Sequence, residues 1–126
     1  MKEHMFEQDI LQQLWNKSRE LEGMDPRLFR KDPCGAIIAW EQYEQQTSPF
    51  GWGVDHIYPV EKGGDDNIEN LRVMHCLNLK AKGNDYPVYE SAVTMDIVDN
   101  KPYVSQFRVK EEIQKKLSLL YPESIL

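Results

Sequence analysis

The stretch of sequence that decides the fold lies between residues 51 and 83 and reads GWGVDHIYPVEKGGDDNIENLRVMHCLNLKAKG. Its apolar segments are short, and a polar segment with a Gly-Gly pair separates them, which is typical of strands joined by a loop. Gly83 follows the last helical residue and is a suitable stop for a helix. We predict, in order, a strand, a polar loop, a second strand and a short helix, over residues 51–57, 58–67, 71–74 and 76–82.

Asp55 and His56 are the residues of this stretch that carry chemistry. They are neighbours at the end of the first predicted strand, where a regular strand would send them to opposite faces and a break would turn both into one pocket. A carboxylate oxygen suits a hard cation such as Mg²⁺, and a histidine takes a proton from water near neutral pH. Asn70, fourteen residues beyond His56, is placed to orient the imidazole. These are the parts needed for metal-assisted hydrolysis of a phosphodiester.

The order and spacing of these residues resemble the HNH nuclease family. That family has Asp-His-Ile-x-Pro, a Gly-Gly loop, Asn-Leu and a final Asn-x-x-Lys-Gly element, and residues 51–85 follow this pattern closely. The resemblance implies a ββα-metal motif in which Asp55 binds the metal, His56 is the general base and Asn70 holds His56. Residues 25–36 resemble the lead-in of small bacterial HNH proteins that lack zinc cysteines.

One position departs from the family. With Lys82 as the lysine of the last element, the final metal ligand falls on Leu79, which has no lone pair. In a working DNA endonuclease with one Mg²⁺ or Mn²⁺ ion, Asn78, His75 or water would supply the missing contact. The alternative is a retained fold that has lost catalysis. A third interpretation is an unrelated Asp-His pair in a turn.

Basic residues near the motif are candidates for phosphate binding. Lys82 and Lys80 lie in the predicted short helix, and Arg72 lies in the second strand. If the C-terminal helix packs nearby, further basic residues join a local rim, namely Arg108, Lys110, Lys115 and Lys116. The alternative for the last two is pairing with Glu111 and Glu112 on a solvated face.

Length and charge limit the possible functions. The chain has 126 residues, 40% of them hydrophobic, and a formal net charge of −6. This length and composition predict one globular domain over residues 1–126 and argue against a disordered chain. The negative net charge argues against non-specific electrostatic binding of nucleic acid by the protein surface as a whole. It favours the alternative that the chain is a binding or inhibitory protein that engages a nucleic-acid-processing partner through its acidic surface. The expected partner is DNA for an active enzyme and a protein for a degenerate one, and the oligomeric state stays open.

Cys34 and Cys76 are the only cysteines, so the sequence has no disulfide framework. Together with His75 they offer three zinc ligands without a fourth, so we expect buried thiols and no structural zinc. We find neither a signal peptide nor a membrane span, and expect a cytoplasmic protein.

The flanking sequence completes an α+β domain around the central unit. Apolar periodicity predicts an N-terminal helix over residues 7–21, a short strand over 35–40 and a C-terminal helix over 110–121. Alternating apolar residues predict a hairpin between strands at 89–97 and 103–109, with its turn at residues 99–101. The three tryptophans are expected in the core, although they are also candidates for stacking on bases.

Overall fold

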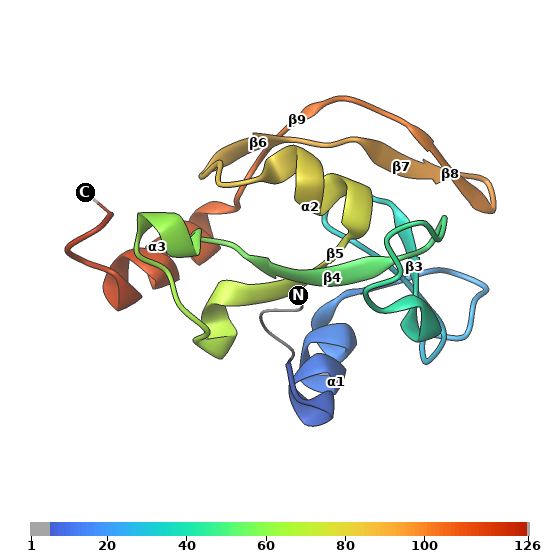
Figure 1. Ribbon diagram of the computed structural model, residues 1–126, viewed down its shortest axis with the longest axis horizontal. Helices are drawn as coiled ribbons and strands as arrows, with labels where there is room; N and C mark the ends of the chain where they lie inside the picture. The colour runs from blue at the N-terminus through green and yellow to red at the C-terminus, as the bar shows by residue number, and fades with distance from the viewer. Residues whose placement is uncertain (1–5, 126) are drawn as a thin grey trace.

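The computed structural model describes residues 6–125 and shows a mixed α+β fold (Figure 1). The helices are α1 (Gln8–Lys17), α2 (Cys76–Lys82) and α3 (Glu111–Leu120), with short 3-10 helices η1 (Trp40–Gln42), η2 (Val60–Lys62) and η3 (Ile68–Asn70). The strands are β1 (Arg19–Glu20), β2 (Phe29–Lys31), β3 (Ile37–Ala39), β4 (Trp52–His56), β5 (Leu71–His75), β6 (Val88–Glu90), β7 (Val93–Asp96), β8 (Asp99–Pro102) and β9 (Gln106–Arg108). All strand pairs are antiparallel.

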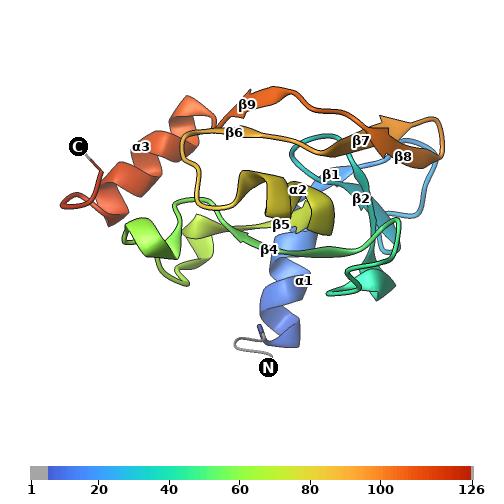
Figure 2. The ribbon, with the colours of Figure 1, turned by 45° about the horizontal axis from the view of Figure 1, so that its top comes forward.

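The central unit is the antiparallel pair β4–β5, followed directly by α2. The predicted strand, loop, strand and helix are confirmed here, and the pairing runs from Trp52 opposite His75 to His56 opposite Leu71. α1 and α2 contact this pair from opposite sides, as Figure 1 shows. The strands β6 to β9 form a long ribbon on the far side of α2 (Figure 2). The β4–β5 pair is therefore covered on both faces.

The N-terminal helix is shorter than the prediction of residues 7–21. It ends at Lys17, and Ser18 turns into extended backbone with its hydroxyl donating to the Trp15 carbonyl (2.5 Å). The next residues form β1, which pairs with β2. The buried Arg30 guanidinium fixes this ending by donating to the Ser18 carbonyl (2.9 Å). A distant side chain thus overrides the helical periodicity that extends through Leu21.

The second hairpin exists, but its predicted turn at residues 99–101 is wrong. Asp96 pairs with Asp99, so the turn is Ile97-Val98, and Ile97 is 84% exposed instead of facing the core. Asn100 lies in β8, where its side chain accepts from the Ile37 N–H (2.8 Å) and donates to the Ile37 carbonyl (2.9 Å). This contact with β3 holds Asn100 in the strand and moves the turn toward the N-terminus.

Two apolar clusters form the core, one on each side of the β4–β5 pair. The first lies under α1 and contains Leu14, Trp15, Trp52 and Val73. The second is built from Tyr58, Met74, Tyr89 and Leu117 together with neighbours on β9 and α3. The expectation of core tryptophans is confirmed for Trp15 and Trp52, which are fully buried, and the half-buried Trp40 ring lies 5.4 Å from that of Trp15.

Between residues 6 and 125, no helix has the length and apolar character needed to cross a membrane.

Candidate functional site

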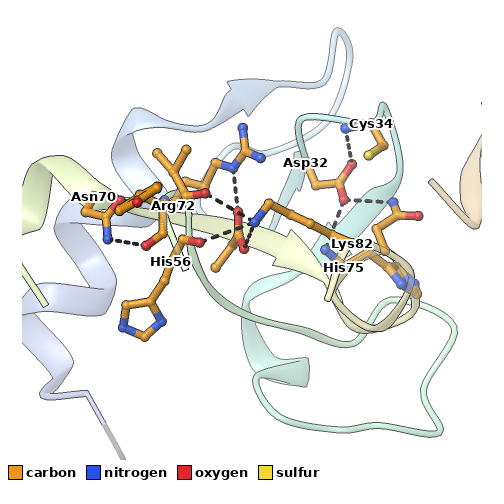
Figure 3. A network of polar contacts seen from close by, with 11 residues as sticks. Asp32, Cys34, His56, Asn70, Arg72, His75 and Lys82 are labelled. Atoms are coloured by element: carbon orange, nitrogen blue, oxygen red, sulfur yellow. Dashed lines mark hydrogen bonds and ion pairs between the residues drawn. The ribbon is translucent and has the colours of Figure 1, made fainter. Parts of the chain in front are cut away.

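The Asp55 carboxylate is buried and held by two cations. It lies in β4, where its Oδ2 accepts from Arg72 Nε at 2.8 Å across the strand pair. Its Oδ1 lies 3.3 Å from the ammonium of Lys82, which reaches over from the last turn of α2. Figure 3 shows Arg72 and Lys82 with the dashed lines that mark these two contacts. Asp55, Arg72 and Lys82, here named the ion cluster, therefore form one buried charged unit.

Lys82 has no path to solvent. Its side chain is 0% exposed, and its ammonium also donates to the carbonyls of His56 (3.3 Å) and Ile57 (3.2 Å). Burial lowers the pKa of Lys82, and the Asp55 carboxylate opposes that shift. Burial also works against the charged form of Arg72, but the Asp55 carboxylate raises the pKa of Arg72 above its usual value. The carboxylate thus outweighs the desolvation of Arg72 and offsets only part of the desolvation of Lys82.

His56 takes no part in the ion cluster through its side chain. The strand ladder stays regular through residue 56, so the expected break that would turn both residues into one pocket is absent. The imidazole points to the other side, where its Nε2 lies 2.7 Å from Asp66 Oδ1 and its ring is 6.1 Å from that of Phe6. Strand alternation therefore separates the two side chains that the metal motif requires together.

Asn70 holds the loop between β4 and β5 instead of the imidazole. Its Oδ1 accepts from the Tyr58 N–H (2.7 Å), and its Nδ2 donates to the carbonyls of Tyr58 (3.0 Å) and Asp65 (3.0 Å). The side chain is fully buried, and these three bonds fix its amide group. The expected role of orienting His56 is replaced by closing the loop that contains the Gly63-Gly64 turn.

Asp32 is a central residue that sequence reasoning missed. It is fully buried and accepts four hydrogen bonds: from Cys34 N–H (2.8 Å), Ala36 N–H (2.9 Å), His75 N–H (3.0 Å) and Asn78 Nδ2 (2.9 Å). Burial, together with the nearby Asp32 charge, raises the pKa of Cys34 to about 12. No local sequence signal pointed to this role, because two of the four partners, His75 and Asn78, lie more than forty residues away along the chain.

Asn78 and His75, the two candidates for the missing metal contact, are both engaged in structural bonds. In addition to its bond with Asp32, the Asn78 amide forms hydrogen bonds with the backbone of residues 92–93, where the chain passes from β6 to β7. The His75 Nδ1 accepts from the Leu77 N–H (3.0 Å), which caps α2, and its Nε2 donates to the Pro49 carbonyl (2.8 Å). Both side chains are fixed by α2 and its packing partners.

The side chains assigned to the metal do not fit a divalent ion in this arrangement. Both oxygens of Asp55 already face cations, and Leu79 packs against Gly53 so closely that a Cβ there would lie 3.0 Å from its Cδ1. Within residues 6–125, no three His, Cys, Asp or Glu side chains are grouped to hold a metal. The ammonium of Lys82 supplies the positive charge that balances Asp55.

The candidate phosphate-binding residues are dispersed. Lys82 is enclosed in the ion cluster, while Lys80 lies exposed on the outer side of α2. Arg72 belongs to the ion cluster and also lines a cavity with Arg108, Lys110 and Lys116. Lys116 pairs with Glu69 at 3.3 Å. The structure therefore brings part of the predicted basic rim together, on the side of β5 that faces α3.

Comparison of this chain with protein-family models, curated proteins and solved structures found no match.

Proposed function

We propose that this chain is a non-catalytic binding protein that retains an HNH-like ββα unit without its metal. The observation that carries the proposal is the ion cluster, in which one oxygen of the buried Asp55 is paired with Arg72 and the other with the fully buried Lys82. Because two cations already neutralise the negative charge of this carboxylate, it attracts a metal ion only weakly. Leu79 at the last ligand position and the separation of Asp55 from His56 support the same proposal.

The partner that we propose is a nucleic-acid-processing protein with a positively charged cleft. The net charge of −6 supports it, as do the exposed side chains of Glu61, Asp65, Asp66 and Glu69 in the loop between β4 and β5. Acidic residues gathered on one loop would compete with nucleic acid for a basic cleft. A reducing, cytoplasmic location is part of this proposal, since Cys34 and Cys76 are buried and form no disulfide.

A DNA endonuclease is the second candidate function, and one observation favours it. His56 Nε2 lies 2.7 Å from the Asp66 carboxylate, and the histidine side chain is 22% exposed. A partly accessible histidine that is oriented by a carboxylate is the arrangement expected of a general base. This pair would act on water without using the ion cluster.

Plasmid nicking distinguishes the two functions. We expect no cleavage of supercoiled DNA by the wild-type protein in Mg²⁺ or Mn²⁺, and no heat of Mg²⁺ binding in a calorimetric titration. His56→Ala, which removes the candidate base, should behave as the wild type does. Leu79→Asn, which restores an oxygen at the last ligand position, tests whether one substitution regains metal binding.

Metal-dependent nicking by the wild type that disappears in His56→Ala would establish the endonuclease and refute a non-catalytic protein. Asp85→Ala serves as the matched control, because it removes an exposed carboxylate close to α2 and leaves Asp55, His56 and Leu79 unchanged. Nicking that persists equally in His56→Ala and Asp85→Ala identifies a contaminating nuclease.

A further inference from the structure

A cavity of about 550 Å³ collects basic side chains from across the chain. Its lining residues come from α1, β1, β2, η3, β5, β6, β9 and α3 and from the segments beside them. Seven basic and two acidic residues line it. The basic ones are Lys17, Arg19, Lys31, Arg72, Arg108, Lys110 and Lys116. Nearly half of the 15 basic residues of this acidic protein therefore surround one cavity.

Three carboxylates compensate part of this positive charge, namely Asp32 and Glu69 in the cavity wall and Asp55, which pairs with Arg72. Glu69 pairs with Lys116 at 3.3 Å, and the Asp32 carboxylate is fully buried and already accepts four hydrogen bonds. Lys31 and Arg108 come from β2 and β9, which lie far apart in the sequence. Converging cations in a concave site raise the local potential for an anion even when the whole protein is acidic.

Arg72 contributes charge to the wall of this cavity and no free donor. Its Nε donates to Asp55 at 2.8 Å, and its Nη2 is buried, so this atom offers no surface to a ligand. The basic side chains that a ligand can reach are therefore the half-buried Lys31 and the exposed ones, namely Lys17, Arg19, Arg108, Lys110 and Lys116.

The remaining wall of the cavity is apolar and partly aromatic. The Tyr89 and Phe107 rings are stacked 5.9 Å apart at 20°, and the Arg72 guanidinium lies 5.3 Å from the Tyr89 centroid. Ligand sites of about 300 to 1,000 Å³ with apolar walls and a few converging polar groups are typical of small-molecule binding. The volume suits a small ligand, and the partly exposed Phe107 ring offers it an aromatic surface.

We infer that this cavity binds a nucleoside di- or triphosphate. The phosphates contact the exposed lysines and arginines at the rim, and the base lies along the aromatic wall. A compact ligand with several negative charges matches an enclosed group of cations better than a singly charged one does. This inference goes beyond the proposed partner binding, and it requires neither metal binding nor catalysis at Asp55 and His56.

Calorimetric titration with four probes tests the inference on the whole chain in magnesium-free buffer. The probes are ATP, inorganic pyrophosphate, adenosine and a ten-nucleotide oligothymidine. We expect ATP to bind at least tenfold more tightly than pyrophosphate, because the base adds contacts, and adenosine to give no measurable binding. Lys31→Glu and Arg108→Glu, on two different strands, should each weaken ATP binding at least tenfold.

Lys62→Glu is the matched control, since it makes the same change of charge at an exposed lysine of η2 that is not among the cavity residues. It should change the ATP dissociation constant less than twofold. The inference is overturned if wild-type protein binds neither ATP nor pyrophosphate at millimolar concentration, or if Lys62→Glu weakens ATP binding as much as the cavity variants do. It is also overturned if the oligothymidine binds tenfold more tightly than ATP, which would identify a site for a nucleic-acid strand. Circular dichroism shows that each variant is folded, and two independent variants keep the test valid if one fails to fold.

Discussion

At the scale of single residues, Asp32 is a buried carboxylate that connects separate segments of the chain. Its two oxygens accept from the turn at residues 34–36, from the start of α2 and from Asn78 within α2. Hydrogen bonds to a buried charge are among the stronger ones in proteins. Asp32 therefore joins the segment that precedes β3 to the central unit.

We expect Asp32→Ala to lower the free energy of unfolding by about 3 kcal/mol or more, because it leaves several buried donors without an acceptor. Urea denaturation followed by circular dichroism measures this loss. Glu41→Ala, which removes an exposed carboxylate, should stay within about 0.5 kcal/mol of wild type. Equal effects of the two substitutions would show that the Asp32 network contributes little to stability.

At the scale of elements, the β7–β8 hairpin has an unusual turn. Ile97 has a φ of 60°, a left-handed conformation that glycine or asparagine adopts readily and a β-branched residue rarely does. The side chain is 84% exposed, so packing does not compensate for this conformation. The contacts of Asn100 with Ile37, which fix the register of β8, impose the turn at this position.

Ile97→Gly is expected to raise the free energy of unfolding by about 1 kcal/mol, since it relieves a conformation that costs about 1 to 3 kcal/mol in other residues and the new glycine offsets part of this gain. Chemical denaturation provides the measurement. Val98→Gly is the control, because Val98 is exposed and is not among the non-glycine residues with positive φ. A loss of stability in Ile97→Gly as large as that in Val98→Gly would contradict the argument.

At the scale of the whole molecule, the two apolar clusters share the β4–β5 pair. The three tryptophans lie together on the α1 side, with ring centroids 5.2 to 5.8 Å apart. The other cluster has tyrosines but no tryptophan. Tryptophan fluorescence therefore reports on one cluster, whereas far-ultraviolet circular dichroism reports on all helices and strands.

We predict that both signals give the same denaturation midpoint, because both clusters pack against the β4–β5 pair and should unfold together with it. Leu14→Ala truncates a buried leucine of the first cluster, under α1, and Leu117→Ala truncates one of the second cluster. Each should lower both midpoints together, with a loss of about 2 to 5 kcal/mol. If Leu117→Ala shifts the midpoint of only one signal, the cluster that contains Leu117 unfolds separately and the chain is not one domain.

Local sequence patterns by themselves determined the elements of the central unit and the C-terminal helix. The apolar runs of β4 and β5, Gly83 and the stripe of α3 each act over a few residues, so their structure could be predicted without knowledge of the rest. The end of α1 and the turn at Ile97 could not, since Arg30 and Asn100 fix them through contacts between segments far apart in the sequence.

The tertiary structure alone decided the chemistry of the site. Asp55, His56, Asn70 and Lys82 were recognisable as candidates, but only the fold shows that Asp55 is held by Arg72 and Lys82 while His56 faces Asp66. The basic cavity draws on elements from α1 to α3 that lie far apart in the sequence. Long-range electrostatic pairing depends on positions in space, and no spacing along the chain encodes those positions directly.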